Sequence, residues 1–491
     1  MGGAIPGGGD VNATGWRRVG IALAIVALAG FVGYFVNHLN INPAGWTWEQ
    51  EYLFPALNPV GSDFRSGLYR PAEALLHGAD PYADSQPWDP PFTILVGIPF
   101  QLLDEDHGYL IQVWLLVGMN VLTLWMALKV SGEVFARAPG RVDQGLVFPL
   151  FCALCLWLVT SYGFLFSIER GSFDIYAGLA AVIGLWLTIK RPDRVWLQVL
   201  CFSIAAHLKV YPAILFLLPV WKHGWRSLLP LAVVNLVLLL CLGPTNLMHF
   251  LSSVTGAIQA PDLWQGNHSA ASFGHLINGY LNERGLGSVP VWVFYALPVG
   301  LWVVGSLLLL RRGYDHAGAV WLFCLSVPGM NLIPATSPDF KLVLVVTPLA
   351  IALFHAVWEY AHSGRWVRLL QMGAVGGLIA ILGLSYTRVP AILGNKYPFI
   401  LALQAVVVWM IVTPPGKKVL QLASVEPPMP QANSVAGTHS NTSSGSALRK
   451  MLLAGWVSDS LQRTRPLSPD AGWVRAKGSP GPASPLQPGS E

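Results

Sequence analysis

A histidine, a lysine and a tyrosine stand in the most apolar part of the chain, within the stretch IAAHLKVYP at residues 204–212. An ionisable side chain at membrane depth costs from about 2.5 kcal/mol upward and normally faces a cavity or a functional site. Lys209 could therefore hold an anion such as a phosphate, and a structural ion pair with a carboxylate is the alternative. On a regular helix His207 and Lys209 point to different sides, so only a broken backbone would bring both to one ligand.

An acidic and aromatic segment precedes this stretch. Residues 58–92 read NPVGSDFRSGLYRPAEALLHGADPYADSQPWDPPF. Its apolar residues follow helical spacing from Phe64 to Leu76, which predicts an amphipathic helix in the membrane interface with Asp63 at its N-terminus. Asp63 is either part of the helix cap, together with Ser62, or a carboxylate at the edge of the membrane that could deprotonate a hydroxyl nucleophile.

Arg170 stands in a third polar stretch. The sequence SIERGSFDIY, residues 167–176, sets this arginine beside two acidic residues and a glycine, just before a predicted helix. A cation next to a helix N-terminus can hold an anion, including a phosphate. An ordinary charged helix cap would explain the same residues, so both interpretations stay open.

Two more segments carry polar side chains at expected helix mouths. They read WQGNHSAASFGHLINGYL (264–281) and IPATSPDFKLVLVV (333–346). No matching carboxylate accompanies the histidines of the first segment, which makes a metal site unfavourable and suits a hydroxyl-rich ligand better. The residues that we expect to contact such a ligand are Asp80, Tyr82, Tyr211, Asn267, His268, Asp339 and Lys341.

Membrane helices must hold these side chains in place. The chain of 491 residues is 53% hydrophobic and only 11% charged, whereas soluble domains are about 25% charged. Runs of roughly 16–22 apolar residues recur, each long enough or nearly so to cross about 30 Å of hydrocarbon as a helix. Lysine and arginine lie at helix ends instead of forming a stripe, which argues against nucleic acid. The sequence predicts an all-α polytopic membrane protein.

Loop charge orients the predicted spans, because lysine and arginine accumulate on the cytoplasmic side. The Arg17–Arg18 pair places the N-terminus inside, whereas residues 38–89 hold seven acidic groups and two arginines and belong outside. This assignment is self-consistent only if residues 90–103 and 195–221 do not cross the bilayer. We expect the second stretch to form a hairpin with Lys209 at its apex; one long tilted helix is the alternative.

The predicted organisation has three parts. Residues 1–18 form a cytoplasmic N-terminus, and residues 19–413 form a bundle of about 10–12 spans with a short re-entrant helix pair. Its outer loops lie at about 38–89, with interfacial helices, and at about 244–288. The Pro- and Ser-rich residues 414–491 predict a disordered cytoplasmic tail.

In their order, the motifs resemble a known superfamily. The first-loop aspartate followed by G-x-D-P-Y and P-P-F, the ERGSFD turn and HLKVYP are similar to polyprenyl-phosphate-sugar-dependent glycosyltransferases of the GT-C superfamily. The set looks most like glycosyltransferase family 87, the mycobacterial-type α-mannosyltransferases and arabinofuranosyltransferases. RGS and HLKVYP also resemble the GPI mannosyltransferase I catalytic subunit, which has R-G-N and H-x-K-x-Y-P there. The likeness covers roughly residues 20–410.

The resemblance implies inverting transfer of a sugar, with mannose as the leading candidate, from a polyprenyl phosphate to a lipid or glycan acceptor. Carried over by position, Asp63 is the base, and Lys209 holds the donor phosphate with Arg170 and His207. The active site would face the extracytoplasmic side of the cell membrane.

Two departures from the family pattern bear on these expectations. Ser172 stands where relatives have Asn, which leaves mannose and arabinofuranose both open. Asp63 lacks a D-x-D partner, which argues against an obligatory divalent metal. The expected partners are the donor, the acceptor and membrane lipid, without a further cofactor or nucleic acid.

Two other functions are alternatives. A lipid-linked-sugar flippase or other transporter would need polar residues along a path to both faces, whereas the polar residues here gather on one face. The sequence also shows no internal repeat, on which many transporter folds are built. A non-catalytic subunit of a glycan assembly complex would leave the many polar groups of that face without a role.

Overall fold

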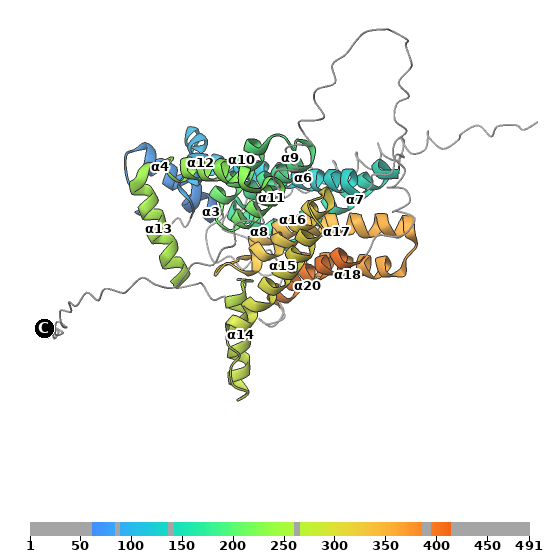
Figure 1. Cartoon of the computed structure of the whole chain (residues 1–491). Coiled ribbons are helices and arrows are strands. Elements are labelled where there is room, and N and C mark those ends of the chain that lie inside the picture. The colour runs from blue at the N-terminus through green and yellow to red at the C-terminus, as the bar shows by residue number, and fades with distance from the viewer. Residues whose placement is uncertain (1–60, 84–88, 136–141, 260–265, 385–393, 414–491) are drawn as a thin grey trace, which may run out of the picture. The chain divides into compact units, whose positions relative to one another are not determined.

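The computed structural model describes residues 61–83, 89–135, 142–259, 266–384 and 394–413. Within them the chain is helical, and the single β-type contact is a bridge between Asn267 and Pro338. The prediction of an all-α polytopic membrane protein is confirmed. The elements (Figure 1) are α3 (Ser62–Phe64), η1 (Arg65–Tyr69), α4 (Arg70–Leu76), α5 (Pro91–Gly97), η2 (Ile98–Leu102), α6 (Glu105–Phe135), α7 (Val142–Thr160), α8 (Tyr162–Arg170), α9 (Asp174–Lys190), α10 (Val195–Leu208), η3 (Tyr211–Phe216), α11 (Leu217–His223), η4 (Gly224–Ser227), α12 (Leu228–Leu239), α13 (Gly243–Gln259), α14 (Ala270–Glu283), α15 (Trp292–Arg311), α16 (His316–Leu332), η5 (Asp339–Lys341), α17 (Leu342–Ser363), α18 (Trp366–Gly383) and α20 (Tyr397–Val412).

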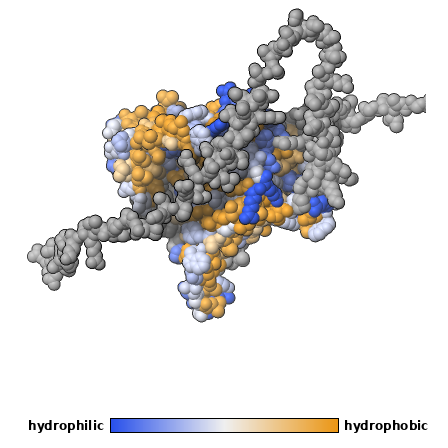
Figure 2. Space-filling view, in the orientation of Figure 1, coloured by the Kyte–Doolittle hydropathy of each residue, from blue (hydrophilic) through white to orange (hydrophobic). Residues whose placement is uncertain are grey.

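The helices α16 and α17 form the buried centre of the bundle. Every residue of α16 from Gly318 to Leu332 is buried, and so is 83% of the apolar window of the span that contains α17. In the peripheral α15 only 22% of that window is buried. Apolar side chains are also exposed along α12 and α13, where Figure 2 shows an apolar surface. Large exposed apolar surfaces are rare in soluble proteins and fit contact with lipid.

Fewer helices qualify as spans by length than the sequence suggested. Four helices of the described part are long and apolar enough to cross a membrane, or up to six if each of two bent pairs is one span. Three shorter apolar helices, Pro91–Leu102, Val195–Leu208 and Tyr397–Val412, fall below that length. The expected N-terminal segment 1–18, the first span and the tail 414–491 lie outside the described residues.

Residues 195–221 reverse direction at Lys209. Helix α10 ends at Leu208, and Lys209 has extended backbone angles of φ −146° and ψ 133°. The chain then returns through η3 and α11, so that His223 Nε2 lies 2.9 Å from the amide oxygen Oε1 of Gln198 in the first turn of α10. Both ends of the stretch therefore lie together, as a hairpin requires and one long tilted helix does not.

The predicted amphipathic helix is present from residue 62 to 76 as α3, η1 and α4 in succession. Neither Ser62 nor Asp63 caps it, because the cap position is Gly61, in the left-handed region at φ 75°, and no side chain bonds there. Stretch 90–103 packs across this helix as α5 and η2: Gln101 Nε2 donates to the Tyr69 carbonyl at 2.7 Å. The expected loop 244–288 consists largely of α13 and α14.

Candidate active site

Asp63 is held by the end of α8. The backbone N–H of Gly61 donates to the Glu169 carbonyl at 2.7 Å, which fixes the start of α3 beside Arg170. Oδ1 of Asp63 accepts from Nε of Arg170 at 2.9 Å, and Nη2 lies 2.6 Å from the same oxygen. Both side chains are mostly buried, at 18% and 22% exposure. The predicted cation and carboxylate thus form one pair.

Lys209 pairs with Asp89, the residue before the Pro90–Pro91 dipeptide. Its Nζ donates to Oδ1 of Asp89 at 2.9 Å and lies 3.9 Å from the ring centroid of Phe173. Thr93 Oγ1 in α5 donates to the carbonyls of the last turn of α10, which holds the two segments together. The structural ion pair considered for this lysine is present, and it places a cation at the break after α10.

Asp174, Tyr211 and Lys341 complete the group. Asp174 is the fully buried first residue of α9; Ser172 Oγ donates to its Oδ2 at 2.5 Å, and the Tyr211 hydroxyl donates to its Oδ1. Nζ of Lys341 lies 4.4 Å from the Tyr211 ring centroid and donates to the Thr336 carbonyl. We call the following residues the charge cluster: Asp63, Asp89, Arg170, Asp174, Lys209, Tyr211 and Lys341.

The charges of the cluster act on one another, as the pKa shifts of Asp63 and Asp89 show. Burial raises the pKa of Asp63, while the positive charges of Arg170 and Lys209 oppose the rise. Burial likewise raises the pKa of Asp89, opposed chiefly by Lys209. Desolvation makes a carboxylate more basic, and a neighbouring cation favours its ionised form; a general base requires both properties.

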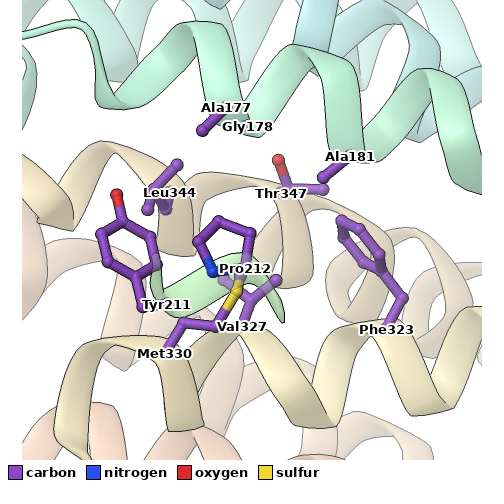
Figure 3. A pocket seen from close by; sticks show the side chains of 10 residues that line it. All are labelled: Ala177, Gly178, Ala181, Tyr211, Pro212, Phe323, Val327, Met330, Leu344 and Thr347. Carbon is purple, nitrogen blue, oxygen red and sulfur yellow. The ribbon is translucent and has the colours of Figure 1, made fainter. Parts of the chain in front are cut away.

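A small apolar cavity adjoins the cluster behind Tyr211 (Figure 3). Its volume is about 10 Å³, roughly that of one water-sized probe. Small residues of α9 meet Pro212 and side chains of α16 and α17 there, and the Tyr211 hydroxyl points toward α9. This cavity is therefore too small to hold a ligand of the cluster such as a sugar or a phosphate.

Several predicted site residues lie apart from the cluster or at its edge. The His207 ring lies 3.0 Å from Oδ1 of Asn235 in α12, inside helix packing. Asp80 pairs with His249 at 2.9 Å and lines a separate polar cavity of about 640 Å³ beside α4. Tyr82 stays close, since its hydroxyl donates to the Asp89 carbonyl at 3.2 Å.

Asn267, His268 and Asp339 form a second, fully buried network. Nε2 of His268 lies 2.5 Å from Oδ1 of Asp339, whose Oδ2 accepts from Tyr162 at 3.0 Å. Nδ1 of His268 accepts the N–H of Lys396, so the imidazole proton belongs on Nε2. Asn267 binds the Ser337 N–H and the Ala335 carbonyl. The network ties residues 267–269 and 395–397 to η5, from which Lys341 projects.

Asp89 and Asp174 are the cluster members that the sequence reading did not assign. The signal for Asp89 is indirect: a buried lysine needs a carboxylate, and Asp89 is the acidic residue next to the rigid Pro-Pro entry. Within the described residues no three His, Cys, Asp or Glu side chains are grouped as metal ligands.

The comparison with protein families matches the region that supplies most of the cluster. The family model described as glycosyltransferase family 87 matches residues 89–334, half of the chain. That range includes Asp89, Arg170, Asp174 and Lys209, while Asp63 lies before it and Lys341 after it. No curated protein matches the chain. On this match, the chain belongs to glycosyltransferase family 87.

Proposed function

We propose that this membrane glycosyltransferase transfers mannose from a polyprenyl-phosphate donor to a lipid or glycan acceptor, with inversion, on the extracytoplasmic face. One observation carries the proposal: a carboxylate, Asp63, and two cations, Arg170 and Lys209, lie in one half-buried cluster. Inverting transfer needs a base on one side of the anomeric carbon and positive charge at the departing phosphate on the other.

In the proposed reaction Asp63 accepts the proton of the acceptor hydroxyl as that oxygen attacks the anomeric carbon. Lys209 and Arg170 stabilise the charge that develops on the phosphate as the bond to the sugar breaks. The break after α10 turns Lys209 away from the helix, so its ammonium can meet the head of a donor whose prenyl chain stays in lipid. We expect Tyr82, Tyr211 and Lys341 to contact the sugar of the donor.

Replacing Asp63 tests the proposal. We expect Asp63→Asn to lower sugar transfer by about 10²–10⁴-fold, because the amide cannot accept the proton. Lys209→Ala should also abolish transfer. The matched control is Asp104→Asn, an exposed aspartate paired with His107, which should keep wild-type turnover. The assay uses purified protein in liposomes with polyprenyl-phosphate mannose and extracted glycolipids, and mass spectrometry identifies the product.

Normal turnover by either cluster variant would remove the assignment. Product from polyprenyl-phosphate arabinofuranose, with none from the mannose donor, would change the sugar and leave the base in place. Movement of labelled donor lipid across the vesicle membrane without any glycosidic product would favour a flippase instead.

A further inference from the structure

The ammonium group that we assign to the donor phosphate is already bound to a carboxylate. Lys209 Nζ and Asp89 Oδ1 lie 2.9 Å apart, and the two side chains are only 16% and 15% exposed. The Phe173 ring covers another side of the ammonium. A phosphodiester that reaches Lys209 therefore meets a neutral, shielded ion pair and not a free cation.

Asp89 has little freedom to move aside. The buried Pro90 and Pro91 follow it, and Tyr82 donates a hydrogen bond to its carbonyl. Gly67 of η1 approaches from another side, since a Cβ built on it would lie 3.5 Å from Oδ2 of Asp89. The proline rings restrict the backbone next to Asp89, and the contacts with Lys209 and Gly67 favour a carboxylate that stays beside Lys209 when a ligand arrives.

The charges around Asp89 make a second anion unfavourable there. Asp89 faces Lys209 after α10, Lys341 of η5 and Asp174 of α9. Asp63 acts on the same lysine. A phosphodiester adds one negative charge to this half-buried group. Because the repulsion between its oxygens and a fixed carboxylate is weakly screened there, the carboxylate must lose its charge for the ligand to bind well.

We propose that Asp89 sets the affinity for the donor: its carboxylate holds Lys209 in the free protein and takes up one proton from water when the phosphodiester binds. This inference rests on the proposed function, which makes a prenyl phosphodiester the donor. No bond of the donor changes in this step. The ammonium contact passes from the carboxylate to a phosphate oxygen, and Asp89 becomes a neutral carboxylic acid.

The sign of the pH dependence follows. Burial already raises the pKa of Asp89 against the opposing charge of Lys209, and a bound phosphate cancels that opposition. Proton uptake makes binding tightest at low pH. Affinity should fall by about tenfold per pH unit between the pKa of Asp89 in the free protein and its pKa in the complex.

A binding experiment tests this without catalysis. The probe is a prenyl methyl phosphodiester, which carries one charge at every pH used and has no sugar to transfer. Its dissociation constant is measured from pH 5 to 9 with the full-length protein in detergent. For Asp89→Asn we expect tighter binding than wild type at high pH, equal binding at low pH and a pH dependence that lacks the proton taken up by Asp89. Asp104→Asn should behave as wild type, and Asp63→Asn should keep the wild-type slope.

Weaker binding by a folded Asp89→Asn protein, or an unchanged slope, would overturn the inference and make Asp89 a fixed support for Lys209. If Asp63→Asn abolishes the pH dependence of binding, Asp63 and not Asp89 is the group that takes up the proton. If the probe binds as expected but the liposome assay gives no product from the sugar donor, the role of Asp89 stands and the transferase proposal fails. If wild type does not bind the probe at any pH, both fail.

Discussion

At the scale of single residues, Asp63 is a desolvated carboxylate beside a cation, an environment that suits a base. Arg170 binds the carboxylate of Asp63, and Asp63 is not the cap of its helix, whose cap position is Gly61. The same pairing would let Arg170 move from the carboxylate to a phosphate oxygen while it stays within reach of both.

The raised pKa of Asp63 gives a pH prediction for catalysis. A base works in its ionised form, so activity is present above its pKa and is lost as the pH falls through it. Because burial raises the pKa of Asp63, we expect kcat at saturating donor to fall as the pH is lowered. The midpoint of this fall should lie above the ordinary aspartate pKa of about 3.9.

Measuring kcat at saturating donor separates this loss of activity at low pH from the proposed tighter donor binding at low pH. If Asp89→Asn retains turnover, its kcat should show the same fall at low pH as the wild type. A kcat that stays constant from pH 8 to pH 4 would rule out Asp63 as the titrating base.

At the scale of elements, close contact between backbones fixes the cluster. A Cβ on Gly97, at the end of α5, would lie 2.2 Å from the Leu68 carbonyl oxygen and 2.9 Å from Cβ of Ala72. Helix α5 begins just after Asp89, and Leu68 lies one turn beyond Asp63. Gly97 therefore allows the helix that follows Asp89 to pack on the helix that carries Asp63.

Gly97→Ala should separate these elements. Because the contact is with a backbone carbonyl that cannot turn away, we expect a loss of about 1–3 kcal/mol in the free energy of unfolding. The thermal unfolding temperature in detergent, with donor binding as a second readout, measures the effect. Gly118→Ala in α6 is the control, since nothing lies within 4 Å of its Cβ and alanine favours a helix. Equal unfolding temperatures for the two variants would contradict the close packing.

At the scale of the whole molecule, the hairpin at Lys209 decides which helix ends share a face. His223 bonds to Gln198, and Lys222 Nζ donates to the Thr188 carbonyl at the end of α9. The loops after α9 and after α11 therefore lie on one face. The charge cluster gathers at the opposite ends of the same helices, the start of α9 and the end of α10.

Cysteine labelling tests this topology. In a background without the five native cysteines, Arg191→Cys and Arg226→Cys should react with a membrane-impermeant maleimide from one side, and Glu73→Cys from the other. All three native side chains are exposed. Reaction of the Arg191→Cys and Arg226→Cys proteins from opposite sides would mean that residues 195–221 cross the membrane.

The sequence by itself determined the membrane class, the helix from 62 to 76 and the break at Lys209, and it indicated Asp63 and Lys209 as candidate site residues. These are local properties, since apolar run length, helical spacing and the cost of a charge in lipid are all readable within one segment. The hairpin also followed from loop charge, because basic residues flank both of its ends.

Only the tertiary structure decided the partners. It joined Asp89 to Lys209 across 120 positions and brought Asp174 to Tyr211. It also turned His207 toward Asn235 and buried His268 against Asp339. The physical reason is that a buried charge must find an opposite charge, but which one it meets depends on how distant helices pack.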